Sequence, residues 1–513
     1  MIGVLLGMRK NTLILLGFML LKFLLQYCLV LPEYDLHRDE YLHLDQANHL
    51  AWGFQSVPPF TSWVALLIRE LGNDIFWVRF FPSLWGALTL LVVWKTTEAL
   101  KGDRLALMLG ALGVLLSVLL RLNQLFQPNS FDVLCWTLLY YILIRYINSK
   151  EPRWLYAGAV IFALAFYNKY NIGFLLLGLL PAILLTEHRQ MLSRKALYGA
   201  LLLGLLLVLP NLWWQYSNGF PVIGHMKELA ASQLVNVNRA DFLKEQLLYF
   251  IGSIHLLLLA LYALFFYKPF APYRLFGYAL VFTLAIFAYF KAKGYYAIGL
   301  YPVFLAFGTV YLSHLLRPRW RMIAAPVLVA VPILVFLPLY QVAFPNRTPE
   351  YIINHQDRYQ KFGLLRWEDG KDHPLPQDFA DMLGWSELAN KVDSVHATLA
   401  RSGNTLVLCD NYGQAGAINY YSKRGIRAVT FNADYINWFD LSRPYVNLVR
   451  IKTFEGPDTE MEETAKFFAK AALADSIANP HAREFRTRIY RFEQAHIDVN
   501  ARIAAEIKEV KSR

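Results

Sequence analysis

Long apolar stretches alternate with short polar breaks over the first 345 residues of the chain. A stretch of about 17–25 apolar residues is long enough to cross the hydrocarbon core of a bilayer as a helix. We therefore predict about eleven membrane-spanning helices. They lie near residues 11–32, 83–100, 104–121, 131–148, 153–168, 171–187, 196–214, 246–267, 274–291, 295–316 and 321–341.

The pattern changes after Phe344 and Pro345, where charged residues become as frequent as in an ordinary soluble domain. Short apolar runs at 404–409, 427–431 and 445–451 predict strands, and 385–400 and 414–421 predict helices. We expect residues 461–510 to be helical. The predicted fold is an all-α polytopic membrane domain over 1–344, with a first external loop at 33–82. A small α/β domain with a helical C-terminal segment follows over 345–513.

The composition supports a membrane protein, because 56% of the residues are hydrophobic and only 17% are charged. Residues 1–345 contain 27 Lys and Arg against 15 Asp and Glu, whereas residues 346–513 contain 23 of each. The net charge of +12 therefore belongs to the apolar part of the chain. Basic charge in such a region is typical of membrane topology rather than of a nucleic-acid surface.

The distribution of Lys and Arg among the short loops predicts the orientation in the membrane, since cytoplasmic loops are enriched in these residues. Basic loops occur at one set of helix ends: Lys101 and Arg104, Lys150 and Arg153, Arg194 and Lys195, and Arg317 to Arg321. With these ends and the N-terminus inside, and an odd number of spans, we expect residues 345–513 to lie outside.

Acidic residues of the membrane part gather in the predicted external loop, where seven of the fifteen fall between Glu33 and Asp74. A solvated loop is the simplest interpretation. However, other polar residues are predicted at the same membrane boundary, where charged groups are costly and usually have a partner or a function. Each also has a structural alternative, such as lipid anchoring by a lysine or helix capping by an aspartate. The candidates are Arg38, Asp39, Glu40, Asp132, Lys169, Lys291, Lys293 and Tyr296.

Several blocks of sequence carry a resemblance to a known family. They are Leu36-His-Arg-Asp-Glu-Tyr-Leu42, His49-Leu-Ala-Trp-Gly53, Phe126-Gln-Pro-Asn-Ser-Phe-Asp132, Asn168-Lys-Tyr170, Lys293-Gly-Tyr-Tyr296 and Asn411-Tyr-Gly-Gln-Ala-Gly-Ala417. In this order they resemble bacterial GT-C glycosyltransferases of the protein O-mannosyltransferase-like group. That group includes the aminoarabinose transferase of lipid A. The resemblance extends from about residue 30 to residue 440.

The resemblance implies transfer of a sugar from a polyprenyl-phosphate carrier to a glycan, lipid or protein acceptor at the external face of the bacterial inner membrane. It implies that Asp39 is the general base, with Glu40 and Asp132 as further catalytic carboxylates. An acceptor hydroxyl must lose a proton as it attacks the anomeric carbon, which a carboxylate within reach can accept. Cations would stabilise the lipid phosphate that leaves. Our candidates are Lys293, Lys169 and Arg38, with Lys291 and Tyr296 beside them.

Two points separate this chain from the family pattern. Many relatives carry Pro-Asp at the start of the fourth span, whereas this chain has Pro128-Asn129 with Asp132 three residues later. Some relatives also bind a divalent metal. Glu40, His43 and His49 carry suitable ligand atoms for a divalent cation, but their spacing matches no metal motif, so we predict no required metal or other cofactor.

Two other functional classes fit a polytopic chain. A transporter or lipid flippase would favour internal repeats and polar residues near the middle of the membrane, and the sequence shows neither. A non-catalytic scaffold would not explain why Asp39 and Lys293 are both predicted at the same membrane boundary. We therefore predict a transferase that contacts membrane lipids and no nucleic acid. The identity of the sugar and of the acceptor stays open.

Overall fold

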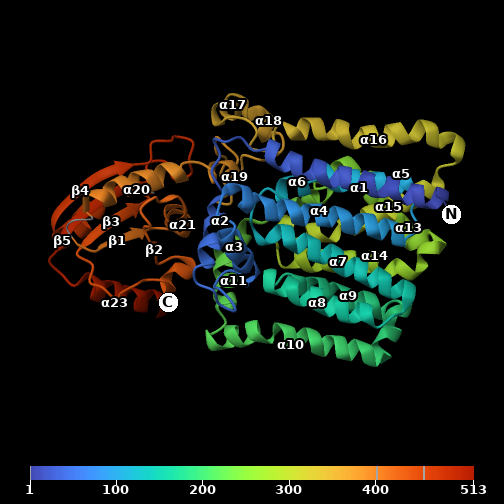
Figure 1. Cartoon of the computed structure of the whole chain (residues 1–513), viewed down its shortest axis with the longest axis horizontal. Coiled ribbons are helices and arrows are strands. Elements are labelled where there is room, and N and C mark those ends of the chain that lie inside the picture. Colours follow the sequence, from blue (N-terminus) through green and yellow to red (C-terminus); the bar gives the residue numbers. More distant parts are fainter. Residues whose placement is uncertain (1, 400–402, 455–456, 513) are drawn as a thin grey trace. The chain divides into compact units, whose positions relative to one another are not determined.

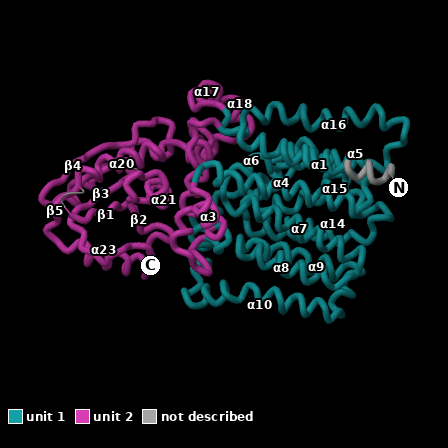
Figure 2. The backbone as a smooth tube through the Cα atoms, in the orientation of Figure 1, with its two compact units in different colours: residues 1–30, 57–61, 74–346 teal, residues 31–56, 62–73, 347–513 magenta. Residues whose placement is uncertain are grey.

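The computed structural model describes residues 2–399, 403–454 and 457–512. The chain divides into two compact units (Figure 2). Unit 1 contains residues 1–30, 57–61 and 74–346. Unit 2 contains residues 31–56, 62–73 and 347–513. Most of the predicted external loop therefore groups with the C-terminal residues rather than with the helices that precede and follow it in sequence.

Unit 1 is a bundle of helices (Figure 1), and each of the eleven predicted apolar segments overlaps one of its main helices. These helices are α1 (Ile2–Cys28), α4 (Ile75–Ala99), α5 (Arg104–Leu115), α7 (Pro128–Ser149), α8 (Arg153–Asn168), α9 (Ile172–Leu184), α10 (Lys195–Ser217), α13 (Ile254–Phe266), α14 (Arg274–Tyr289), α15 (Pro302–Leu315) and α16 (Pro318–Tyr340). Shorter elements connect them: α6 (Leu119–Leu122), η1 (Glu187–Ser193), α11 (Pro221–Ser232), η2 (Leu234–Asn236), α12 (Arg239–Leu248), η3 (Ile251–Ser253), η4 (Lys268–Tyr273) and η5 (Gly294–Leu300).

Among the described residues, six helices are long and apolar enough to cross a membrane, or nine if each of three bent pairs counts as one span. Helices α5 and α8 fall short of that length. A polytopic helical architecture is therefore confirmed, whereas the number of eleven spans stays a prediction. Helix α16 is strongly apolar, yet only 6% of its most apolar window is buried. Such an exposed apolar surface is typical of a helix that contacts lipid.

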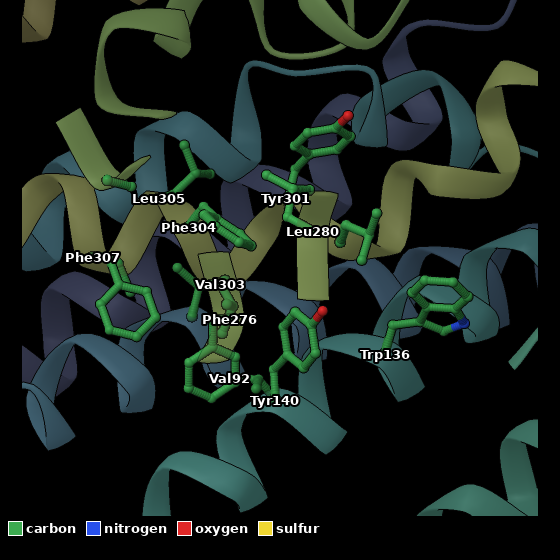
Figure 3. Packing of buried hydrophobic residues seen from close by; sticks show 14 of the residues in the cluster. Val92, Trp136, Tyr140, Phe276, Leu280, Tyr301, Val303, Phe304, Leu305 and Phe307 are labelled. Atoms are coloured by element: carbon green, nitrogen blue, oxygen red, sulfur yellow. The ribbon is translucent and has the colours of Figure 1, made fainter. Parts of the chain in front are cut away.

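The core of unit 1 consists of aromatic and branched side chains from several helices (Figure 3). Trp136 and Tyr140 on α7 are fully buried, and the Tyr140 ring meets Phe276 of α14 edge-on at a centroid distance of 5.0 Å. Phe276 in turn contacts Phe307 of α15 at 5.6 Å. Aromatic pairs of this geometry add to the energy of burial, so α7 is anchored along its length by its neighbours.

Unit 2 contains a five-stranded mixed sheet in the order β2-β1-β3-β5-β4. The strands are β1 (Thr405–Cys409), β2 (Ala428–Thr430), β3 (Asn447–Lys452), β4 (Phe468–Ser476) and β5 (Arg488–Ala495). Strands β2 and β3 pair in parallel with β1, and α21 (Tyr412–Tyr421) connects β1 to β2, while β4 and β5 form an antiparallel pair. The three strands predicted from the sequence are β1, β2 and β3, which confirms a small α/β domain.

The remaining helices of unit 2 come from both ends of its sequence. They are α2 (Arg38–Gln46), α3 (Phe60–Glu70, of which the first two residues belong to unit 1), α17 (Pro349–Asn354), α18 (Gln356–Gln360), α19 (Gln377–Ala380), α20 (Trp385–Leu399), α21 (Tyr412–Tyr421), α22 (Glu460–Thr464) and α23 (Val499–Ser512), with η6 (Ala433–Asn437) and η7 (Ala465–Phe467). The predicted helices at 385–400 and 414–421 correspond to α20 and α21. Residue 400 lies outside the described residues.

The prediction of a helical segment over 461–510 is wrong for most of its length. Only α22 and α23 at its two ends are α-helical, and β4 and β5 lie between them. Strand β4 is rich in alanine, which favours a helix locally. Pairing with β5, whose Tyr490 and Phe492 are buried in the domain core, overrides that local preference.

Candidate functional site

The predicted catalytic base, Asp39, lies in the first turn of α2, a helix whose start is determined by its own sequence. His37 is the N-cap, and its Nδ1 accepts a hydrogen bond from the backbone N–H of Asp39 at 3.2 Å. The buried Glu40 completes the capping box, because its Oε2 accepts from the backbone N–H of His37 at 2.6 Å. The structure therefore gives Glu40 a role in positioning the helix.

The carboxylate of Asp39 is bound by a residue far away in sequence. The Tyr412 hydroxyl, at the start of α21, donates a hydrogen bond to Asp39 Oδ1 at 2.7 Å. The guanidinium carbon of Arg38 lies 4.6 Å from the centre of the Tyr412 ring, so Arg38 packs on the tyrosine. The Asp39 side chain is still 40% exposed. The Asp39 carboxylate is thus oriented by Tyr412, and part of its side chain is accessible to solvent.

The charges around Asp39 favour its ionised form. Burial raises the pKa of Asp39, but the positive fields of His37 and Arg38 and the hydrogen bond from Tyr412 outweigh burial and hold the pKa below its usual value. Burial, followed by the adjacent Asp39 charge, raises the pKa of Tyr412 well above the usual value for tyrosine. The hydroxyl therefore stays protonated as a donor, and Asp39 is a carboxylate at neutral pH.

Two further residues hold the start of α2 against the rest of unit 2. The buried Asp381 accepts a hydrogen bond from Arg483, with both carboxylate oxygens 3.0 Å from Nη1, and lies 3.8 Å from His37 Nε2. Its backbone carbonyl accepts from the N–H of Arg38 at 3.0 Å. Asp381 and Arg483 were not among the sequence candidates, since isolated charged residues in a soluble domain carry no recognisable signal.

Two glycines of α21 permit α2 to approach closely. A Cβ at Gly416 would lie 2.7 Å from the Tyr41 Cβ and 3.1 Å from the Tyr41 backbone carbon, and one at Gly413 would lie 2.7 Å from the Arg38 Cγ. Distances below about 3 Å are too short for carbon atoms in van der Waals contact. The block Asn411–Ala417 therefore has a structural reason for its glycines, and it is the signal from which Tyr412 could have been found.

A second cluster of predicted site residues lies within unit 1, around the first turn of α7. Asp132 is buried, and its oxygens accept hydrogen bonds from Trp136 Nε1 at 3.0 Å and from Asn171 Nδ2 at 2.9 Å. These two neutral donors bind Asp132 into the bundle. In the geometry observed, Asp132 connects α7 to the turn between α8 and α9.

The same turn presents Lys169, whose Nζ donates to Asn129 Oδ1 at 2.8 Å. Asn129 lies where the family resemblance led us to expect an aspartate. Within the described part of the chain no carboxylate lies within 4 Å of Lys169. Its Nζ lies 4.2 Å from the ring centre of Tyr296 and 5.2 Å from that of Tyr295. Asp132 is the carboxylate whose charge acts on this ammonium, from beyond ion-pair distance.

Lys293 precedes η5 and extends toward the same tyrosines. Its Nζ donates to Gln233 Oε1 at 2.5 Å and lies 6.0 Å from the ring centre of Tyr295. Lys291 adopts a left-handed backbone conformation, with φ of 52°. The structure thus brings Lys169, Lys293, Tyr296 and Asp132 together in unit 1, whereas Arg38, Asp39 and Glu40 belong to unit 2.

The residues considered as metal ligands have other contacts. His43 is buried, with its Nδ1 3.4 Å from Gln46 Oε1, and the His49 ring stacks on Trp438 at 4.2 Å. Among the described residues, no three His, Cys, Asp or Glu side chains are grouped in a way that would hold a metal ion. That the reaction needs no metal or cofactor stays a prediction.

Comparison with known proteins identifies the fold. The crystal structure of ArnT from Cupriavidus metallidurans bound to undecaprenyl phosphate matches with a TM-score of 0.61, covering 93% of this chain and 97% of that one at 14% identity. The apo structure of the same protein gives 0.59, with 94% and 98% covered at 13% identity. This chain has a GT-C fold. The GT-C fold that the sequence resemblance implied is therefore confirmed.

Sequence comparison places the GT-C chain beside two further relatives. Residues 56–214 match the family described as dolichyl-phosphate-mannose-protein mannosyltransferase. The lipid A galacturonosyltransferase RgtD of Rhizobium johnstonii is 26% identical over 235 residues. That match covers 45% of this chain and 48% of RgtD, so the chain spans about half the length of this curated relative.

Proposed function

We propose that this GT-C protein is a membrane glycosyltransferase that moves a sugar from a polyprenyl-phosphate carrier to an acceptor, with Asp39 as general base. The environment of Asp39 is the observation that carries the proposal. Its carboxylate has a lowered pKa, is oriented by Tyr412 and is 40% exposed. A base that is ionised, oriented and reachable is what activation of an acceptor hydroxyl requires.

The two oxygens of Asp39 have different roles in this proposal. Oδ1 accepts the Tyr412 hydroxyl, while Oδ2 lies 4.0 Å from His37 Nδ1. The acceptor proton moves to Oδ2 as the acceptor oxygen attacks the anomeric carbon, and the bond from that carbon to the carrier phosphate breaks. Products are the glycosylated acceptor and a polyprenyl phosphate. The tyrosine orients the carboxylate and takes no proton.

Unit 1 supplies the positive charge that such a reaction needs. Lys169 has an amide as its hydrogen-bond partner, and Lys293 is likewise bonded to an amide oxygen. A phosphate that accumulates charge in the transition state is stabilised by such cations. We assign Lys169 and Lys293 to the donor phosphate, with Tyr296 as an aromatic neighbour and Lys291 as a weaker contributor.

An envelope lipid is the acceptor class we favour. One relative, RgtD, is a lipid A galacturonosyltransferase, which supports this choice of acceptor. The ArnT structure bound to undecaprenyl phosphate supports the carrier. We propose a hydroxyl or phosphate of an outer-envelope glycolipid such as lipid A, with the reaction on the external side of a bacterial inner membrane. The choice of hexose or pentose belongs to contacts outside these two clusters.

Mass spectrometry of envelope lipids from a strain lacking the gene tests this proposal. We expect one glycolipid to lose the mass of a single sugar residue. Plasmid-borne wild-type protein restores that mass, and the Asp39→Asn variant, produced at equal level in the membrane, does not. Identical envelope lipids and glycans in the deletion and parent strains would contradict the proposed activity.

A further inference from the structure

A cavity of about 550 Å³ lies in unit 1 at the end of the bundle where α4 and α7 finish. It is lined by Lys95, Glu98, Ala99, Tyr141, Arg145 and Asn148. Arg145 follows Asp132 by thirteen residues on the same helix. At 1.5 Å per residue the two are about 20 Å apart along the axis. The cavity is therefore separate from the cluster assigned to the donor phosphate.

Arg145 is held in a fixed position by aromatic side chains. Its Nη1 donates to the Tyr141 hydroxyl at 2.8 Å, and its guanidinium carbon lies 4.6 Å from the Trp154 ring centre. Over the residues that the structure describes, no carboxylate lies within 4 Å of this guanidinium. The charge is thus oriented without being neutralised, and its remaining N–H groups are available for a planar, two-point contact.

The rest of the lining contains an ion pair and neutral polar groups. Lys95 and Glu98 form an ion pair at 2.8 Å, and Glu98 also accepts from Trp94. The lining therefore carries one net positive charge, from Arg145. An anionic ligand with several oxygen atoms matches this set of groups.

We propose that this cavity binds the phosphodiester headgroup of an acidic membrane phospholipid. Two phosphate oxygens would contact the Arg145 guanidinium, and Lys95, which also lines the cavity, would contact the same group. Basic pockets between helices at the membrane boundary are suited to anionic headgroups, so a lipid is favoured over a soluble anion.

Native mass spectrometry of the full-length protein, released from nanodiscs, tests this assignment. The probes are phosphatidylglycerol and phosphatidylcholine at equal amounts. We expect the wild type to retain phosphatidylglycerol preferentially and Arg145→Gln to bind it about tenfold more weakly. The matched control is Arg194→Gln, an exposed cation that precedes α10 at the same set of predicted cytoplasmic helix ends, which should retain the lipid as the wild type does.

Arg145→Lys separates charge from geometry, because lysine keeps the charge but loses the planar fork. Intermediate retention is expected. Equal retention of phosphatidylglycerol by the wild type, Arg145→Gln and Arg145→Lys would overturn the proposal. Displacement of the lipid by glycerol 3-phosphate at similar concentration would show that the cavity prefers a soluble anion, and would overturn the lipid assignment.

Discussion

The two clusters of charged residues differ in how their charges are compensated. In unit 2, Asp39 is surrounded by His37, Arg38 and the Tyr412 hydroxyl, all of which favour its negative form. In unit 1, Lys169 and Lys293 are bonded to amide oxygens, which leave their positive charge in place. One region stabilises a base, and the other keeps cations ready for an anion. In the proposed reaction, Asp39 of unit 2 removes the proton, and Lys169 and Lys293 of unit 1 stabilise the phosphate.

The largest effect is expected for Asp39→Asn, which removes the base and nearly preserves the shape of the side chain. We expect the turnover rate of purified protein to fall about 100-fold or more, since general base catalysis contributes on that scale. Asp74→Asn is the matched control, because Asp74 is an exposed carboxylate of the same sequence segment and makes no side-chain cap. A similar loss in both variants would contradict a specific role for Asp39.

The next largest effect concerns the cations of unit 1. Lys169→Met removes the charge and keeps the apolar length, so affinity for polyprenyl phosphate should fall roughly 10- to 100-fold. Lys268→Met, which changes an exposed lysine at the start of η4, should leave the affinity unchanged. Titration with polyprenyl phosphate in detergent measures both. Unchanged affinity in Lys169→Met would remove this residue from the phosphate site.

A smaller effect, visible mainly in the pH profile, is expected for Tyr412→Phe. Loss of the hydrogen bond disfavours the ionised form of Asp39, so its pKa rises. The acidic limb of the pH–rate profile should therefore move to higher pH, by up to about 1 unit, with activity at high pH nearly retained. A uniform loss at every pH, without a shift, would mean that Tyr412 acts only on the packing of unit 2.

The smallest effect on chemistry is expected for Gly416→Ala, which alters the support of α2. The added methyl group would lie 2.7 Å from the Tyr41 Cβ, and such overpacking costs about 1–3 kcal/mol of stability. Thermal unfolding followed by tryptophan fluorescence should show a lower midpoint. Gly224→Ala is the control, since a Cβ there meets nothing within 4 Å. Equal midpoints would contradict the close approach of α2 and α21.

Features governed by local pattern were predictable from the sequence. Each apolar segment overlaps a helix, and the three parallel-paired strands lie where alternation and β-branched residues placed them. Asp39 was a candidate because its block resembles a family. The contact of Tyr412 with Asp39 joins residues 373 positions apart, which no local pattern encodes. Strand β4 was missed because pairing with β5 overrode the local helix preference of its alanine-rich sequence, and β5 lay within the same predicted helical segment.

The external loop is a second feature whose tertiary contacts could not be predicted from the sequence. Residues 31–56 precede a span in sequence but belong to unit 2. The Asp35 carboxylate accepts from the backbone N–H groups of Trp385 and Ser386, each at 3.0 Å, about 350 residues away. Hydrophobic patterning reports which residues enter a membrane. It does not report which partner a polar loop will find, because that depends on hydrogen bonds made only after folding.

The division of roles between the two clusters is tested most directly by measuring donor binding and sugar transfer in the same preparation of Asp39→Asn. The protein is reconstituted in nanodiscs with a polyprenyl-phosphate sugar and envelope lipid acceptor, and mass spectrometry records bound donor and released polyprenyl phosphate. The account predicts donor binding equal to that of the wild type and no transfer above background. Transfer at the wild-type rate, or loss of donor binding as large as in Lys169→Met, would contradict it.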